Sequence, residues 1–95
     1  MSALLSVNSR VKNLDKLKEY ISHASKTIKD HGGVKLNRGR VKKVLSGDVE
    51  YNIVVLFRFP SLEAIDGWYN SPEYQRLLSL RNEGAEMMIT ALEEY

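Results

Sequence analysis

The sequence contains no cysteine, only two histidines and two prolines, and no apolar stretch long enough to cross a membrane. Without cysteine, the chain can have no disulfide framework, no thiolate nucleophile and no Cys-based zinc or iron–sulfur site. The N-terminal stretch, Met1 to Leu5, lacks the basic region and the long apolar segment of a signal peptide. We therefore expect no membrane association and, by default, a cytoplasmic location.

Imidazole groups are also scarce. His23 and His31 lie eight residues apart, and no Asp or Glu completes a metal-ligand spacing around them. A solvent-exposed or helix-capping role is the expected one for both, and a single axial haem ligand is the open alternative. We predict no metal site and no cofactor.

A strong excess of charge of one sign is missing as well. The formal net charge is +2, far from the dense basic surface that nucleic-acid-binding domains usually show. One local run is basic and comprises Lys35, Arg38, Arg40, Lys42 and Lys43. We interpret this run as an exposed strand and loop whose charges keep a sheet edge from pairing with other chains, and we rank RNA binding well below that.

What is present is an ordinary globular composition over 95 residues, 43% of them hydrophobic and 27% charged. We expect a single domain, residues 1–95, with a modest core of its own. The apolar pattern predicts an α+β fold of β-α-β-β-α-β order. The predicted elements are a strand over 3–11, a helix from the N-cap Asn13 to about His31, strands over 34–38 and 53–57, a short helix after Ser61, a helix from Pro72 to about Gly84, and a strand over 87–92.

Some boundaries inside this pattern are less well marked. The first helix carries an apolar stripe at spacings of three and four, made by Leu14, Leu17, Ile21, Ala24 and Ile28. The second strand is expected to bulge or bend at Gly39 and to resume at Val44 and Leu45. For the last segment, a continued helix is the alternative to a strand.

The segment Ile53–Phe57 is the strongest strand signal, because five apolar residues follow one another without a polar break. Consecutive residues of a strand point to opposite faces of a sheet, so this run presents apolar side chains on both faces. Two helices can cover only one of them. We therefore predict that a second copy of the chain covers the other face, which gives a homodimer whose sheets face each other.

Three segments carry a specific signature: Phe59-Pro60-Ser61-Leu62-Glu63-Ala64, Trp68-Tyr69-Asn70-Ser71-Pro72-Glu73-Tyr74 and Leu80-Arg81. In order and spacing it resembles the domain-of-unknown-function 1330 family, and the likeness extends upstream to Val11. The resemblance implies a ferredoxin-like, four-stranded antiparallel sheet with helices on one face, assembled as a dimeric α/β barrel. That superfamily includes cofactor-free monooxygenases, haem-degrading enzymes, lactone isomerases and non-catalytic sensors, so it does not fix a function. Ser46 and Arg58 stand where the family pattern leads us to expect acids.

The candidate ligand-binding residues are Tyr20, Arg38, Trp68, Tyr74 and Arg81. Small-molecule pockets typically combine aromatic walls with a few polar groups. The guanidinium of Arg38 could bind a carboxylate bidentately, and Tyr20 could send its hydroxyl into a cleft between helix and sheet. Arg81 lies seven residues after Tyr74, about two helical turns, so the two share a face.

Each candidate has a structural alternative. Trp68 and Tyr74 could simply pack between helix and sheet, and Arg81 could pair with Glu73 or Glu83. Ser71 is expected to be a helix N-cap rather than a nucleophile, because no adjacent base is identifiable.

These residues predict a small-molecule-binding homodimer with a pocket between helices and sheet in each subunit. The first hypothesis includes a cofactor-independent enzyme acting on a small acidic or aromatic metabolite. The alternative is a non-catalytic ligand-sensing or protein-interaction module, which the lack of an identifiable acid/base pair favours. The sequence assigns no catalytic residue and leaves open whether the protein is an enzyme.

Overall fold

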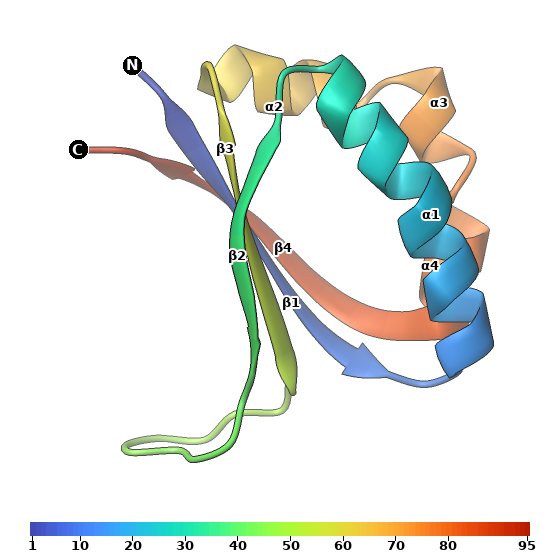
Figure 1. Cartoon of the computed structure of the whole chain (residues 1–95), viewed down its shortest axis with the longest axis vertical. Coiled ribbons are helices and arrows are strands. Elements are labelled where there is room, and N and C mark those ends of the chain that lie inside the picture. The colour runs from blue at the N-terminus through green and yellow to red at the C-terminus, as the bar shows by residue number, and fades with distance from the viewer.

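The computed structural model describes residues 1–95 and consists of a four-stranded antiparallel sheet with helices on one face (Figure 1). The elements in chain order are β1 (Ala3–Val11), α1 (Leu14–Asp30), β2 (Val34–Arg40), β3 (Ile53–Phe59), α2 (Leu62–Tyr69), α3 (Pro72–Gln75), α4 (Leu78–Gly84) and β4 (Ala85–Glu93). The strand order is β2-β3-β1-β4, which makes β3 a central strand and β2 an edge, as predicted. The predicted ferredoxin-like fold is confirmed.

Local signals in the sequence set the starts of three helices. Asn13, Ser61 and Ser71 each precede a helix, and the side chain of each accepts a hydrogen bond from the backbone N–H three residues further on. At the other end of α1, Gly32 has a φ of +86°, the left-handed conformation that glycine adopts most readily. The predicted capping role of Ser71 is therefore confirmed.

The prediction that the second strand resumes at Val44 and Leu45 is wrong. β2 ends at Arg40, and residues 41–52 form an irregular loop that extends beyond the end of the sheet (Figure 1). β3 begins only at Ile53, so Val44 and Leu45 have no strand partner.

The bulge predicted at Gly39 lies instead between Lys35 and Asn37. A bulge adds one residue to one strand of a pair, which changes the faces to which the following side chains point. Although Lys35 and Arg38 are three residues apart, both are therefore paired with β3 residues that face the helices. This shift brings two cations to the inner side of the sheet.

The helix predicted from Pro72 to Gly84 is interrupted. α3 ends after one turn, and the N–H of Leu77 donates to the carbonyl oxygen of Tyr74, three residues back, at 2.8 Å. This bonding pattern is that of a tight turn rather than a continuing α-helix. The final segment is the predicted strand and pairs with β1 along its whole length as β4, so the alternative of a continued helix is wrong.

The core lies between the helices and the inner face of the sheet. Its largest fully buried side chains are Trp68, Tyr74, Phe59 and Leu5. The predicted stripe of α1 needs one correction: Leu14 and Ile21 are about half exposed, at 54% and 48%, while Tyr20 is buried. The buried face of α1 is therefore centred closer to Tyr20 than the sequence predicts, and Ile21 lies at the edge of the helix–sheet contact.

The opposite face of the sheet is not covered by any helix (Figure 1). The pairing of the strands directs a set of apolar side chains to this outer face: Leu4, Val54, Leu56, Met88 and Leu92.

None of the helices has the length and apolar character that a membrane span would need.

Candidate ligand-binding site

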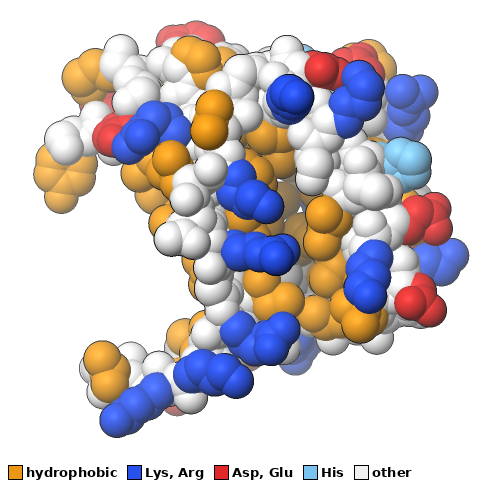
Figure 2. Space-filling model, in the orientation of Figure 1, with side chains coloured by type: hydrophobic (Ala, Val, Ile, Leu, Met, Phe, Trp, Pro, Cys, Tyr) orange, Lys and Arg blue, Asp and Glu red, His pale blue; other side chains and the backbone are white.

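A cavity of about 430 Å³ lies between α1 and the inner face of the sheet, and all four strands contribute lining residues. It falls within the range of about 300–1,000 Å³ that is usual for small-molecule pockets. Thirteen of its nineteen lining residues are hydrophobic, so most of a bound molecule would contact apolar side chains. Figure 2 shows the hollow, with apolar surface visible between the sheet edge and the helix.

The cavity exists because the edge strand offers α1 nothing to pack against. β2 directs Lys35 and Arg38 inward where a core strand would carry apolar residues, and all seven residues of β2 are exposed. The floor comes from β3, whose Val55 and Phe57 are only half-buried. A helix cannot cover two cations closely without desolvating them, so the space stays open.

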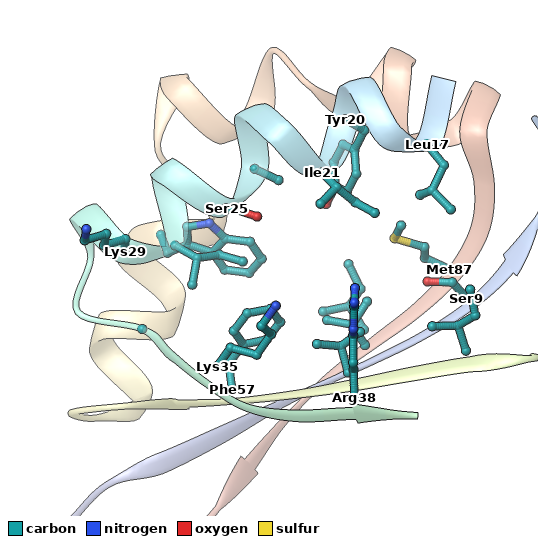
Figure 3. A pocket seen from close by; sticks show the side chains of 18 of the residues that line it. Ser9, Leu17, Tyr20, Ile21, Ser25, Lys29, Lys35, Arg38, Phe57 and Met87 are labelled. Carbon is teal, nitrogen blue, oxygen red and sulfur yellow. The ribbon is translucent and has the colours of Figure 1, made fainter. Parts of the chain in front are cut away.

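All charged side chains that line the cavity are cations: Lys29 from α1, and Lys35 and Arg38 from β2. None of them belongs to any of the four ion pairs in the structure. Lys and Arg side chains line the sheet edge beside the hollow in Figure 2, and Figure 3 shows Lys35 and Arg38 rising from β2 toward α1. The site therefore attracts negative charge.

Tyr20 forms part of the α1 wall and is the start of a buried chain of polar groups. Its hydroxyl lies 2.7 Å from the hydroxyl of Tyr74, and Nη1 of Arg81 donates to the Tyr74 hydroxyl at 3.1 Å. Burial raises the pKa of Tyr20 well above its usual value, so Tyr20 stays a neutral phenol.

Arg81 is a partly buried cation without an acidic partner. Desolvation opposes its charge, but hydrogen bonds to Tyr69 and Tyr74 outweigh that effect and raise the pKa of Arg81. The alternative in which Arg81 pairs with Glu73 or Glu83 is not realised.

The structure divides the five predicted site residues into two groups. Tyr20, Arg38 and Trp68 line the cavity, whereas Tyr74 and Arg81 do not and stand behind Tyr20. The packing alternative also holds for Trp68 and Tyr74, which are fully buried core residues. Trp68 is thus both a core residue and a cavity wall.

Sequence reasoning missed Lys29 and Lys35 as site residues. Ile21, Ser25 and Lys29 recur at a spacing of four along α1, which places them on one side of the helix, and all three line the cavity. That spacing was a signal available in the sequence. Lys35 was noted only as part of the basic run, because only the bulge lets Lys35 and Arg38, three residues apart, point inward together.

A second hollow of about 380 Å³ lies on the other side of Trp68. It shares Trp68, Met87 and Ile89 with the cavity and is also lined by Arg81 and Asp66. Because one acid and one cation line this hollow, its formal charges balance, unlike those of the cavity.

The two histidines have the roles predicted for them. His23 is exposed, and His31 is the C-cap residue of α1, with its Nδ1 2.9 Å from the carbonyl oxygen of Thr27. No three Asp, Glu or His side chains lie close enough together to hold a metal ion.

The family model for the Domain of unknown function (DUF1330) matches residues 2–95. The chain belongs to this family. No curated protein matches it. The signature noted in the sequence is therefore confirmed as a family membership.

Solved structures share the fold at low sequence identity. A protein of unknown function from Rhodopseudomonas palustris has a TM-score of 0.84 and 15% identity, over 99% of this chain and 82% of that one. A dimeric ferredoxin-like protein of unknown function from Jannaschia sp. CCS1 has a TM-score of 0.76 and 14% identity, over 99% and 100%. SnoaB, a cofactor-independent oxygenase from Streptomyces nogalater, has a TM-score of 0.72 and 6% identity, over 99% and 93%.

Proposed function

We propose that this protein binds a small, largely apolar molecule carrying an anionic group in the cavity between α1 and the inner face of the sheet. The observation that carries the proposal is the lining: mostly hydrophobic, with Lys29, Lys35 and Arg38 as its only charged side chains. Apolar walls stabilise the body of such a ligand, and the unpaired cations at the edge of the cavity bind its anionic group. A neutral ligand would leave the cations without a partner.

The proposal is tested with two aromatic probes of similar shape, 2-naphthoate and the neutral 2-naphthalenemethanol, titrated by calorimetry. We expect 2-naphthoate to bind and the neutral alcohol to bind at least about tenfold more weakly, since a hydrogen bond to a charged group contributes about 1.5–3 kcal/mol. Arg38→Gln should weaken the binding of 2-naphthoate by about tenfold. The affinity for the neutral alcohol should stay unchanged.

Arg40→Gln is the matched control. It removes the same charge from the same strand, but Arg40 does not line the cavity. Equal binding of both probes, or equal losses in the two arginine variants, would show that the anion is not recognised in the cavity.

The same proposal includes a homodimer that forms through the outer face of the sheet. Five apolar side chains gather on this face without a helix to cover them, and burying such a surface against a second copy is favourable by about 25 cal/mol per Å². The similar fold of the dimeric ferredoxin-like protein from Jannaschia supports the choice of a second copy as the occupant.

The dimer is tested by sedimentation velocity across micromolar concentrations. Leu56→Asp places a charge at the centre of the outer face and should give monomers, while Ser79→Asp, on the exposed side of α4, should leave the dimer intact. A folded wild-type monomer at these concentrations would contradict the proposed dimer. It would not contradict ligand binding in the cavity.

Two uses of the cavity remain as candidates. Its titratable lining groups are one phenol and three cations, with no carboxylate or imidazole to act as a general base, which favours a non-catalytic ligand sensor. The similarity to SnoaB favours a cofactor-independent enzyme on the same site. Once a probe binds, oxygen uptake and product analysis under air separate the two, because a sensor returns its ligand unchanged.

A further inference from the structure

Arg81 determines which hydroxyl donates and which accepts in the hydrogen bond between Tyr20 and Tyr74. A guanidinium has donors only, so the Tyr74 hydroxyl oxygen must accept from Nη1 of Arg81. The Tyr74 hydroxyl proton then needs an acceptor, and the Tyr20 hydroxyl oxygen, 2.7 Å away, is the only one that the structure gives it. The reverse arrangement would leave the Tyr74 proton unpaired in a fully buried site, which is unfavourable.

When Tyr74 donates to Tyr20, the hydroxyl proton of Tyr20 has no acceptor within the protein. The Tyr20 hydroxyl has no hydrogen-bond partner other than Tyr74, and its ring reaches from α1 toward the interior of the cavity (Figure 3). Tyr20 is therefore a neutral donor among apolar walls, on the side of the cavity opposite the cations of β2. Each donor in the chain polarises the next, so the Tyr20 hydroxyl is a stronger donor than an isolated phenol.

We propose that Tyr20 is a specificity-determining donor that recognises a carbonyl, enolate or phenolate oxygen of the ligand, with Tyr74 and Arg81 as positioning residues behind it. The inference rests on the proposed function and deepens it. The ligand class becomes an apolar, in particular aromatic, molecule with two oxygen functions: an anionic group held from β2 and an acceptor oxygen held from α1. A buried donor without an acceptor discriminates against ligands that lack the second oxygen.

The test uses 6-acetyl-2-naphthoate, which carries a carboxylate and a ketone, and 2-naphthoate, which lacks the ketone. In the wild-type protein we expect the ketone stretch of the bound probe to move to a lower wavenumber than in an apolar solvent, as measured by infrared difference spectroscopy. Tyr20→Phe should abolish that displacement and weaken 6-acetyl-2-naphthoate by about three- to tenfold, the usual effect of one neutral hydrogen bond. Binding of 2-naphthoate should not weaken, because this probe offers the Tyr20 hydroxyl no ketone acceptor, and Tyr51→Phe, outside the cavity, is the matched control.

Two further variants test the positioning role while keeping the Tyr20 hydroxyl. Tyr74→Phe and Arg81→Met each remove one donor behind it, so the ketone stretch should lie between the wild-type and Tyr20→Phe values, with the fold checked by circular dichroism. If the ketone stretching wavenumber in both variants equals that of the wild type, Tyr74 and Arg81 have no positioning role. These variants also give a reading if Tyr20→Phe does not fold.

The outcomes separate the inference from the proposed function. If neither naphthoate binds, the proposed function fails. If both bind but the ketone stretch is not displaced, or is equally displaced in Tyr20→Phe, the donor assignment is wrong while anion binding in the cavity stands.

Discussion

The two halves of the helix–sheet interface are built differently. In the packed half, β1 and β4 present small and apolar residues such as Ala3, Leu5 and Ala85, which are 0–1% exposed under the helices. In the open half, the edge strand β2 presents Lys35 and Arg38, and the cavity takes the place of a core. The cavity therefore lies on the side of the sheet where the edge strand carries cations instead of apolar residues.

Helix α1 lines the cavity with a buried row and an exposed row of residues. Leu17 and Ala24 are buried, whereas Ile21, Ser25 and Lys29 are exposed, and all five line the cavity. Because α1 forms one wall of the cavity, a shift of this helix would change the shape of the site. Contacts that fix α1 therefore control the site.

Two phenylalanines on β3 give the strongest test of the difference in packing between the packed and open halves. Phe59 is 1% exposed and packs on Trp68, so Phe59→Ala should lower the free energy of unfolding by about 3–5 kcal/mol. Phe57 lies two residues earlier at the floor of the cavity and is only half-buried, so Phe57→Ala should cost about 1 kcal/mol. Urea denaturation measures both. Equal losses would mean that the open half is packed as tightly as the core.

A second test addresses the contact that holds α1 against α4. A Cβ added at Gly84 would lie 2.7 Å from the backbone nitrogen of Leu17, and backbone atoms cannot rotate away. Gly84→Ala should therefore lower the free energy of unfolding by about 1–3 kcal/mol. It should also alter 2-naphthoate affinity, because α1 must move.

Gly67→Ala is the control for that substitution. Gly67 lies within α2 with open space around its Cα, so alanine there should raise the free energy of unfolding by about 0.5–1 kcal/mol. If Gly84→Ala is equally harmless, α1 is not fixed by this contact, and the difference between the two halves has another origin.

The fold was predictable because each element carries its own local signal. The N-caps Asn13, Ser61 and Ser71 and the apolar run in β3 act over a few residues, and the structure confirms them. The loop 41–52 was mispredicted because strand formation there depends on a partner strand rather than on the strand-forming residues Val44 and Leu45 themselves.

The candidate site was predictable only in part. Residue type was enough to single out Tyr20, Arg38 and Trp68, which line the cavity. Two features were not readable from the sequence. The bulge that brings Lys35 and Arg38 to the same face has no glycine or proline to mark it. The Tyr20–Tyr74 hydrogen bond joins residues 54 positions apart, so it depends on how α1 and α3 dock.

The smallest expected effect comes from an ion pair outside both halves. Arg58 donates to both carboxylate oxygens of Glu94, at 3.0 and 2.8 Å, and Ser2 donates to the same group, which ties both chain ends to β3. These hydrogen bonds, that of Arg58 foremost, lower the pKa of Glu94 from its ordinary 4.5 to about 2. The folded state therefore favours the ionised form.

A lowered pKa in the folded state stabilises the protein above pH 4.5, and this stabilisation is lost as the pH falls toward 2. Glu94→Gln should slightly lower the urea midpoint at pH 7 and should remove part of the decline between pH 4.5 and 2. The effect is small because exposed ion pairs contribute little and are screened by salt, so the measurement belongs at low ionic strength. Glu93→Gln, the exposed neighbour without an ion pair, is the control. If the two variants show the same pH profile, the Arg58–Glu94 pair does not stabilise the folded state.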